Sequence, residues 1–272
     1  MTHPFTEFEH ETWQRVARKY EEAWSGLTQG FIPALLGAVN IRNGVRVLDV
    51  ACGPGYVAAA AKAAGGEPLG VDFSSEMVRL AGERYPDMEF RVGDAQALDF
   101  PDESFDVAIM NFGMLHLAEP EEAIAECARV LCKGGRFGFS VWAGPDLSAG
   151  ARIVDDAINE YANKDVDIPQ GPDYFAYGRE KACAVSLAKA GFDPDAFLFE
   201  TVVAEWMVPS PTFLFESELH AGVRTAALLA RQSDETLELI SRKIAGAVNS
   251  YAKGNGYAIP FAAHIISGRK FM

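Results

Sequence analysis

The chain has 272 residues, 49% of them hydrophobic and 23% charged, a composition that excludes extensive disorder. Its 24 Lys and Arg against 38 Asp and Glu give a net charge of −14, which disfavours nucleic acid and anionic membrane surfaces as partners. No apolar run reaches the roughly 18 residues of a transmembrane helix, and the polar, acidic N-terminus lacks the pattern of a signal peptide.

Residues 45–142 alternate between predicted strands and helices, which is typical of a parallel sheet covered by helices on both faces. The β-branched run VRVLDV at 45–50 predicts a buried strand, and the Ala-rich segment 56–64 predicts a helix. The other strands expected in this half lie within 65–72 and at 88–92, 105–110 and 134–142, and the other helices at 74–85 and 119–131.

The alternation loosens after Trp142. Helices are expected at 151–162, 179–190, 212–231 and 234–252, and strands at 197–207 and 261–269. No repeat or clean linker divides the chain, so we expect one domain over 1–272. In that domain a cofactor-binding core at 13–142 is followed by inserts at 143–178 and 209–258 that form a substrate lid.

The four cysteines form no C-x-x-C pair or other zinc spacing; they are Cys52, Cys127, Cys132 and Cys183. We therefore expect no metal site and a reduced, cytoplasmic setting.

The loop between the first predicted strand and the first helix carries a glycine motif. Gly53, Gly55 and Ala58 match the pattern G-x-G-x-x-G/A, and Asp72 follows at the distance of a ribose-binding acid. Taken alone, this match also fits a nicotinamide-dependent reductase. Asp49, at the strand end, argues against that alternative because its carboxylate would repel a pyrophosphate. S-adenosylmethionine has no phosphate and carries two cationic groups, so it suits a carboxylate there; the other interpretation of Asp49 is a helix-capping acid.

The segment VLDVACGPG (47–55) resembles the first motif of the class I S-adenosylmethionine-dependent methyltransferases. Three similar motifs follow in the family's order: GVDFS at 70–74, GDAQALDFPDESFDVAIMNFGMLHL at 93–117 and ARVLCKGGRFGFS at 128–140. The resemblance covers about residues 13–142 and is nearest to the ubiquinone and menaquinone biosynthesis subgroup. It implies a Rossmann-like α/β fold with a seven-stranded, mainly parallel sheet, S-adenosylmethionine as cofactor and methyl transfer to a small-molecule acceptor.

The resemblance also assigns roles to motif residues. Asp72 would bind the two ribose hydroxyls, with helix capping as the alternative. Phe73 and Met77 would pack on the adenine face, unless they are ordinary core residues. Asp94 would accept a hydrogen bond from the adenine amino group, and the backbone N–H of Ala95 would serve a ring nitrogen.

Further candidates lie near the transferred methyl group. The carbonyl of Asn111 would hold the methionine ammonium, and residues 112–116 would line the cavity. Tyr20, in the expected helical segment 18–24, would fold over the cofactor or pack against a helix. Gln96 is either a ligand or a solvated loop residue. The full predicted cofactor-binding set is Tyr20, Asp49, Ala51, Gly53, Gly55, Asp72, Phe73, Met77, Asp94, Ala95, Gln96, Asn111 and Phe112.

No single catalytic residue is required for methyl transfer, since positioning alone can lower such a barrier by about 7–11 kcal/mol. His116 is the histidine of the motif region and a candidate general base, although a structural histidine at a helix start is the alternative. A chain that binds S-adenosylmethionine without methyl transfer has the same motifs, and this reading stays open.

The acceptor pocket is expected from the inserts. We expect 209–258, with part of 143–175, to cover the methyl group and form a mainly apolar pocket. The residues behind this expectation are Trp206, Met207, Phe213, Leu214 and Phe215. The alternative is that they fill the core between the lid helices and the sheet. Neither the acceptor's identity nor an oligomeric state is encoded in these motifs.

Overall fold

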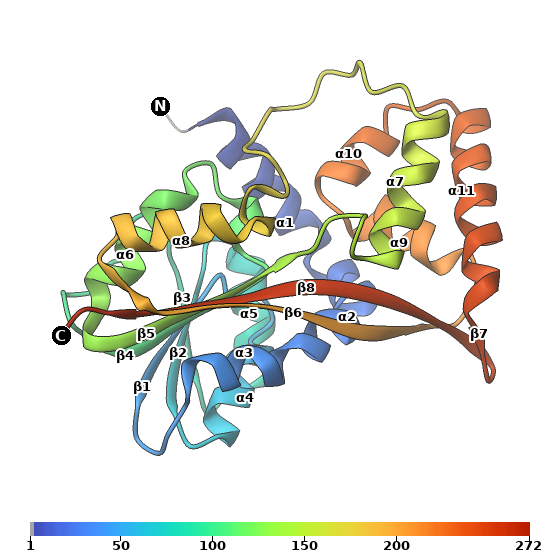
Figure 1. Cartoon of the computed structure of the whole chain (residues 1–272). Helices are drawn as coiled ribbons and strands as arrows, with labels where there is room; N and C mark the ends of the chain where they lie inside the picture. Colours follow the sequence, from blue (N-terminus) through green and yellow to red (C-terminus); the bar gives the residue numbers. More distant parts are fainter. Residues whose placement is uncertain (1–2) are drawn as a thin grey trace.

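The computed structural model describes residues 3–272 and contains one mixed sheet with helices on both faces (Figure 1). The strands are β1 Arg46–Val50, β2 Glu67–Asp72, β3 Glu89–Val92, β4 Phe105–Asn111, β5 Leu131–Trp142, β6 Phe192–Val208, β7 Ala252–Lys253 and β8 Gly256–Lys270. Their order is β3-β2-β1-β4-β5-β8-β6, with β7 paired to β8 beside this path. Pairing is parallel from β3 to β5, and β8 is antiparallel to both of its neighbours. The predicted Rossmann-like, mainly parallel sheet of seven strands is confirmed, and β7 is a short addition.

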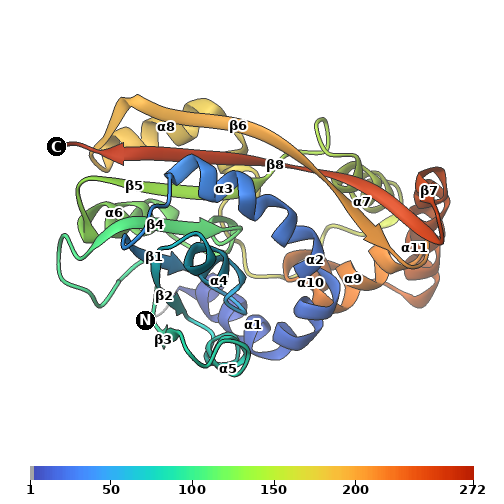
Figure 2. The same cartoon turned by 90° about the horizontal axis from the view of Figure 1, so that it is seen from below.

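Helices cover both faces of the sheet (Figure 2). They are α1 Pro4–Ala23, α2 Ser25–Thr28, α3 Ile32–Val39, α4 Tyr56–Ala63, α5 Ser75–Arg84, α6 Pro120–Val130, α7 Ala149–Tyr161, α8 Glu180–Lys189, α9 Phe213–Ala221, α10 Arg224–Leu229 and α11 Asp234–Val248. Helices α3 and α4 pack on one face, while α6 and α8 pack on the other.

Strand β4 shows why two cores form. Side chains alternate along a strand, so Val107 and Ile109 join the cluster beneath α3 and α4, whereas Ala108 and Met110 join the cluster beneath α6. Both clusters are buried, which fixes the register of the central strands. The carboxyl ends of the parallel strands consequently meet at one edge of the sheet.

A second group of helices lies beyond that edge. Figure 1 shows α7, α9, α10 and α11 gathered at the far end of the β6–β8 ribbon, which continues past the end of β5. Helix α1 packs against both α5 and α9, so it connects this helical group to the sheet. None of the helices within residues 3–272 has the length and apolar character needed to cross a membrane.

Strands β6 and β8 each begin five residues earlier than the strands expected at 197–207 and 261–269, and three helices also differ from the sequence-based expectation. The helix expected at 212–231 is two helices, because the chain turns at Gly222 and Val223; a Cβ at Gly222 would lie 2.7 Å from the Glu218 carbonyl oxygen. The helix expected at 234–252 ends at Val248, and β7 follows a single 3₁₀ turn. Helix α1 begins earlier than the predicted helical segment around Tyr20, since His3 accepts the Phe5 N–H and Pro4 suits a first turn.

Candidate active site

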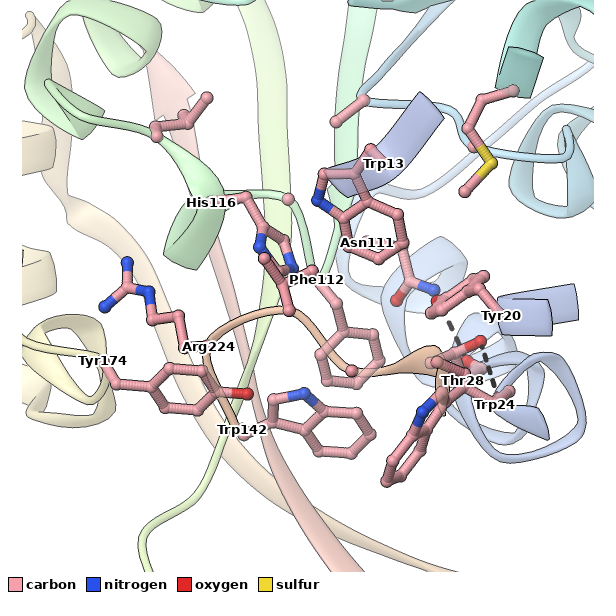
Figure 3. Close-up of a pocket in the computed structure, with 18 of the residues that line it drawn as sticks. Trp13, Tyr20, Trp24, Thr28, Asn111, Phe112, His116, Trp142, Tyr174 and Arg224 are labelled. Carbon is pink, nitrogen blue, oxygen red and sulfur yellow. Dashed lines mark hydrogen bonds between the residues drawn. The ribbon is translucent and has the colours of Figure 1, made fainter. Parts of the chain in front are cut away.

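A cavity of about 350 Å³ opens at the carboxyl edge of the sheet. Its walls combine the loops that follow β1, β2, β3 and β4, the end of β5, helix α1, and the helical group beyond the sheet. Figure 3 shows its labelled side chains converging from α1, from the β4 loop and from the later inserts. In open parallel sheets this edge is the usual position of a ligand.

Asp72 lies at the bottom of one end of the cavity. It ends β2 and is only 5% exposed. Its Oδ2 accepts the Gly53 N–H at 2.9 Å, and its Oδ1 accepts the Ser74 N–H at 2.9 Å. Burial raises the pKa of Asp72 to about 6, although these two bonds oppose the rise. Each carboxylate oxygen keeps a second acceptor site, so the pair can receive two hydroxyl groups.

Gly53 and Gly55 serve different purposes in the glycine loop. Both have positive φ, 51° and 84°, which glycine adopts without strain. Gly53 lines the cavity, and a Cβ there would meet nothing within 4 Å, so the backbone is bare where a ligand approaches. Gly55 is not at the cavity wall, and a Cβ there would lie 2.8 Å from the Phe90 ring. Gly55 therefore packs against Phe90, and its contact with a cofactor stays a prediction.

Asp49 lies beneath the loop rather than at the cavity wall. It is fully buried, and its Oδ2 accepts the Ala58 N–H in the first turn of α4 at 2.9 Å, while its Oδ1 has no hydrogen-bond partner. Burial raises its pKa to about 8, and the nearby Asp72 adds to the rise. The bond to Ala58 is that of a helix-capping acid, which was the alternative interpretation, and contact of Asp49 with the cofactor stays a prediction.

The residues predicted for the adenine line one wall. Phe73, Met77, Asp94, Ala95 and Gln96 all border the cavity. Met77 is 3% exposed, and so its side chain belongs to the core as well as to the wall. The Asp94 Oδ1 accepts the backbone N–H of Gln96 at 2.9 Å, which shapes the loop after β3.

The loops after β1 and β4 both contain a strained backbone. Ala51 and Phe112 have φ of 54° and 56°, the left-handed region that few non-glycine residues adopt, and both line the cavity. Ser140 fixes the second loop: its hydroxyl donates to the Asn111 Oδ1 at 2.6 Å and accepts the Phe112 N–H at 3.0 Å. The Asn111 Nδ2 donates to the Thr28 carbonyl at 3.4 Å, which connects this loop to the N-terminal helices (Figure 3).

Tyr20 lines the cavity from α1 and packs edge-on against Trp13, with 5.1 Å between ring centroids. Burial raises its pKa. Its folding over a cofactor stays a prediction.

Aromatic side chains form the other end of the cavity. Phe112 and Trp142 stack with ring centroids 3.9 Å apart and an interplanar angle of 24°. Figure 3 shows this pair with Tyr174 on one side and Trp24 on the other. Phe175 and Phe261 complete the aromatic lining.

The residues expected to line an acceptor pocket do not reach the cavity. Trp206, Phe213, Leu214 and Phe215 belong to the core cluster or pack on it, and Met207 is 55% exposed on the opposite face of β6. Trp206 stacks on Trp24, with 4.9 Å between centroids, and so packs behind a residue that does line the cavity. The inserts contribute other residues instead: Pro145, Ala151, Val154, Asp155, Ile158, Tyr174, Phe175, Glu218, Ala221, Gly222, Val223, Arg224 and Thr225.

Sequence reasoning missed several charged residues at this site, among them Glu9, Glu218 and Arg224. Glu9, on α1, is fully buried and contacts His116 and Arg224. Glu218 lines the cavity, and burial raises its pKa to about 7. No spacing marks these residues, because their partners lie more than 100 positions away or on another helix. Within residues 3–272 no group of three metal-ligating side chains is close enough to hold an ion.

Residues 48–139 match the family model described as a methyltransferase domain. This segment makes up about a third of the chain. It runs from β1 into β5 and contains the loops around Asp49, Asp72, Asp94 and Asn111, so the resemblance stated from the motifs is confirmed here.

Curated proteins are similar to this chain over part of its length. The demethylmenaquinone methyltransferase of Renibacterium salmoninarum is 33% identical over 155 residues, which cover 56% of this chain and 65% of the relative. The ubiquinone/menaquinone biosynthesis C-methyltransferase UbiE of Bordetella avium is 37% identical over 120 residues, covering 42% and 47%. The chain thus spans about half to two-thirds of the length of these relatives, whose names fall within the predicted subgroup.

A solved structure extends the likeness of fold beyond that domain. It is phosphoethanolamine N-methyltransferase 2 of Haemonchus contortus, in complex with phosphomonomethylethanolamine and S-adenosylhomocysteine. The TM-score is 0.57 at 19% identity, with 98% of this chain and 60% of that chain covered. At this identity the likeness concerns the fold alone.

Proposed function

We propose that this chain transfers the methyl group of S-adenosylmethionine to a small-molecule acceptor. One observation supports this most strongly. A single cavity in the methyltransferase domain has a carboxylate floor at Asp72 and an aromatic wall at Phe112 and Trp142. A polar half suits a nucleoside, and an aromatic half suits an organic acceptor.

The residues present fit the cofactor. The second lone pairs of Asp72 accept the ribose hydroxyls, and Gly53 leaves open space where the nucleoside approaches. Phe73 and Met77 form an apolar surface for the adenine, and Asp94 and Ala95 border the same wall. When bound, S-adenosylmethionine supplies a methyl group on a sulfonium, which is already an activated donor. The chain's contribution is to orient the acceptor and exclude water.

The two inserts, 143–178 and 209–258, serve as the lid and acceptor pocket in this proposal. Their supporting feature is that side chains from both, such as Tyr174 and Val223, line the cavity. Tyr20 closes the cavity from the opposite side. We further propose a reducing, cytoplasmic setting, supported by four free cysteines of which three are buried.

Calorimetric titration with S-adenosylmethionine and S-adenosylhomocysteine tests the cofactor. We expect both to bind, and we expect Asp72→Ala to weaken binding by at least about tenfold because a charged hydrogen-bond acceptor is lost. The exposed Asp87, whose partner is Lys62, gives a matched control, and Asp87→Ala should bind normally. No binding of either compound at millimolar concentration would refute the proposal, and NADH binding instead would favour the reductase alternative.

Methyl transfer itself is tested by incubating the chain with labelled S-adenosylmethionine and a metabolite extract. A labelled product from the wild-type chain is expected. Tight cofactor binding without any labelled product would favour a protein that binds S-adenosylmethionine but does not transfer its methyl group.

A further inference from the structure

Helix α1 places a buried carboxylate against the histidine of the β4 loop. Glu9 is 0% exposed, and its Oε2 lies 2.9 Å from the His116 Nδ1. The same oxygen accepts the Trp13 indole N–H at 3.2 Å, and the Trp13 ring meets the His116 ring edge-on at 4.9 Å. The imidazole of His116 is thus held by its contact with the Glu9 carboxylate and by its contact with the Trp13 ring.

The hydrogen bond to Glu9 fixes the tautomer of His116. A carboxylate only accepts hydrogen bonds, so the Nδ1 must carry the proton, which leaves the Nε2 with a free lone pair. Among residues 3–272 no hydrogen bond reaches the Nε2. His116 lines the cavity and keeps 20% of its side chain exposed, so its basic nitrogen remains accessible (Figure 3).

The remaining charged groups around the pair are few. The Arg224 Nε lies 3.5 Å from the Glu9 Oε1, while its terminal nitrogens donate to the carbonyls of Pro172 and Leu115. The charge of His116 opposes the rise in the pKa of Asp72, which lines the same cavity. The central carbon of the Arg224 guanidinium also lies over the Tyr174 ring, 5.6 Å from the ring centroid.

We propose that Glu9 and His116 form a dyad in which the His116 Nε2 removes the proton of the methyl acceptor and Glu9 positions the ring. This inference rests on the proposed methyltransferase function. As the acceptor's nucleophilic atom forms its bond to the methyl carbon, the carbon–sulfur bond breaks and its electron pair stays on sulfur. The acceptor's proton passes to the Nε2, so the positive charge of the sulfonium reappears on the imidazolium beside Glu9. Glu9 touches no reacting atom and is a positioning residue.

The dyad predicts a structural role for α1 in catalysis. The base stands on the β4 loop and its carboxylate stands on α1, so the base is complete only when α1 covers the cavity. If His116 had only a structural role, its contact with Glu9 would affect the stability of the chain. The ionisation of His116 would then not affect the rate of methyl transfer.

Nitrogen NMR of the ¹⁵N-histidine-labelled chain, saturated with S-adenosylhomocysteine, tests the dyad without turnover. Five histidines give few signals, and the one lost in His116→Asn is assigned to His116. We expect a protonated Nδ1 in the neutral form, and we expect Glu9→Gln to lower the midpoint of the His116 titration by at least about one pH unit. An unprotonated Nδ1, or a midpoint unchanged by Glu9→Gln, would overturn the dyad.

Labelled methyl transfer to the metabolite extract tests the proton-transfer role. His116→Asn should lower the rate by about 100-fold or more while S-adenosylmethionine binds normally. Glu9→Gln should shift the acid limb of the pH–rate profile in the same direction as it shifts the midpoint measured by NMR. His220→Asn, on the exposed end of α9, is the matched control and should keep the wild-type rate.

The outcomes separate the two proposals. A rate within threefold of wild type in His116→Asn, with cofactor binding intact, would overturn the dyad's catalytic role and leave the methyltransferase proposal standing. No labelled product from the wild-type chain would overturn the proposed function and the proton-transfer role together, whereas the NMR result would still report whether Glu9 and His116 are paired.

Discussion

At the scale of the residue, Asp72 connects folding to ligand binding. Its two backbone hydrogen bonds hold the glycine loop after β1 and the start of α5 in place. Its remaining lone pairs face the cavity. Burying a carboxylate without a cation beside it costs free energy, and ligand hydroxyl groups that donate hydrogen bonds to the carboxylate reduce this cost.

The raised pKa of Asp72 predicts a pH dependence of cofactor affinity. In the free chain its pKa is about 6, so the carboxyl group becomes protonated as the pH falls below this value and loses acceptor capacity. We expect the Kd for S-adenosylhomocysteine to rise toward about tenfold per pH unit below pH 6, measured by calorimetry. Asp72→Asn should bind more weakly at every pH and lose this dependence, whereas Asp87→Asn should keep it. A wild-type Kd that stays constant between about pH 5 and about pH 7 would contradict the assignment.

At the scale of the element, helix α7 depends on a glycine that touches β8. A Cβ at Gly150 would overlap the ring of Phe261, which lines the cavity. Gly246, in α11, has open space around the position of its Cβ. The close packing of α7 on β8 therefore requires a glycine at position 150, whereas the packing of α11 does not require one at position 246.

This contrast predicts opposite effects of the same substitution. Gly150→Ala should destabilise the chain by about 1–3 kcal/mol through overpacking and displace α7 from β8. Gly246→Ala should stabilise it by about 0.5–1 kcal/mol because alanine favours the helix. Urea denaturation of both variants measures this. A Gly150→Ala variant as stable as Gly246→Ala would show that α7 does not need the close approach.

Strand β6 presents adjacent residues to opposite environments. Trp206 is 4% exposed and stacks on Trp24, whereas Met207 is 55% exposed. Trp206→Ala should cost about 3–5 kcal/mol of unfolding free energy, and Met207→Ala should change it by less than about 0.5 kcal/mol. Neither should alter the affinity for S-adenosylhomocysteine, since neither lines the cavity. Selective loss of cofactor affinity in Trp206→Ala at unchanged stability would reverse this conclusion.

At the scale of the whole molecule, the cavity joins parts of the chain that are far apart in sequence. Helix α1 provides Trp13 and Tyr20, and the β4 loop provides Phe112. The β8 ribbon contributes Phe261, and α10 begins with Arg224. Binding in such a cavity stabilises all of these elements relative to the unfolded chain.

Hydrogen exchange should therefore detect the ligand in distant segments. With S-adenosylhomocysteine at 100 times its Kd, the global stabilisation is about 2.7 kcal/mol. We expect added protection of amides in α1 and in the loops after β1 and β4, and little change in α8, which packs on the opposite face of the sheet. Unaltered exchange in α1 on saturation would contradict its role as a cover of the cavity.

The sequence alone determined the fold class, most element positions and the polar half of the site. Residues 45–142 carry short-range signals: β-branched runs, an Ala-rich helix, glycines at a strand end and acids that follow strands. In a parallel sheet these strand ends meet at one edge whatever the details of packing, and Gly53, Asp72 and Asp94 all line the cavity there.

Only the tertiary structure decided the aromatic half and its charges. Periodicity could not show that Gly222 divides one expected helix, or that Trp206 stacks on Trp24 instead of facing the cavity. Asp49 lies next to the glycine loop in sequence, yet burial beneath that loop decided that it caps α4. The Glu9–His116 contact joins residues 107 positions apart, and no local pattern encodes such a pair. Local signals fix local structure, whereas the direction in which a lid residue points depends on which distant surface buries it.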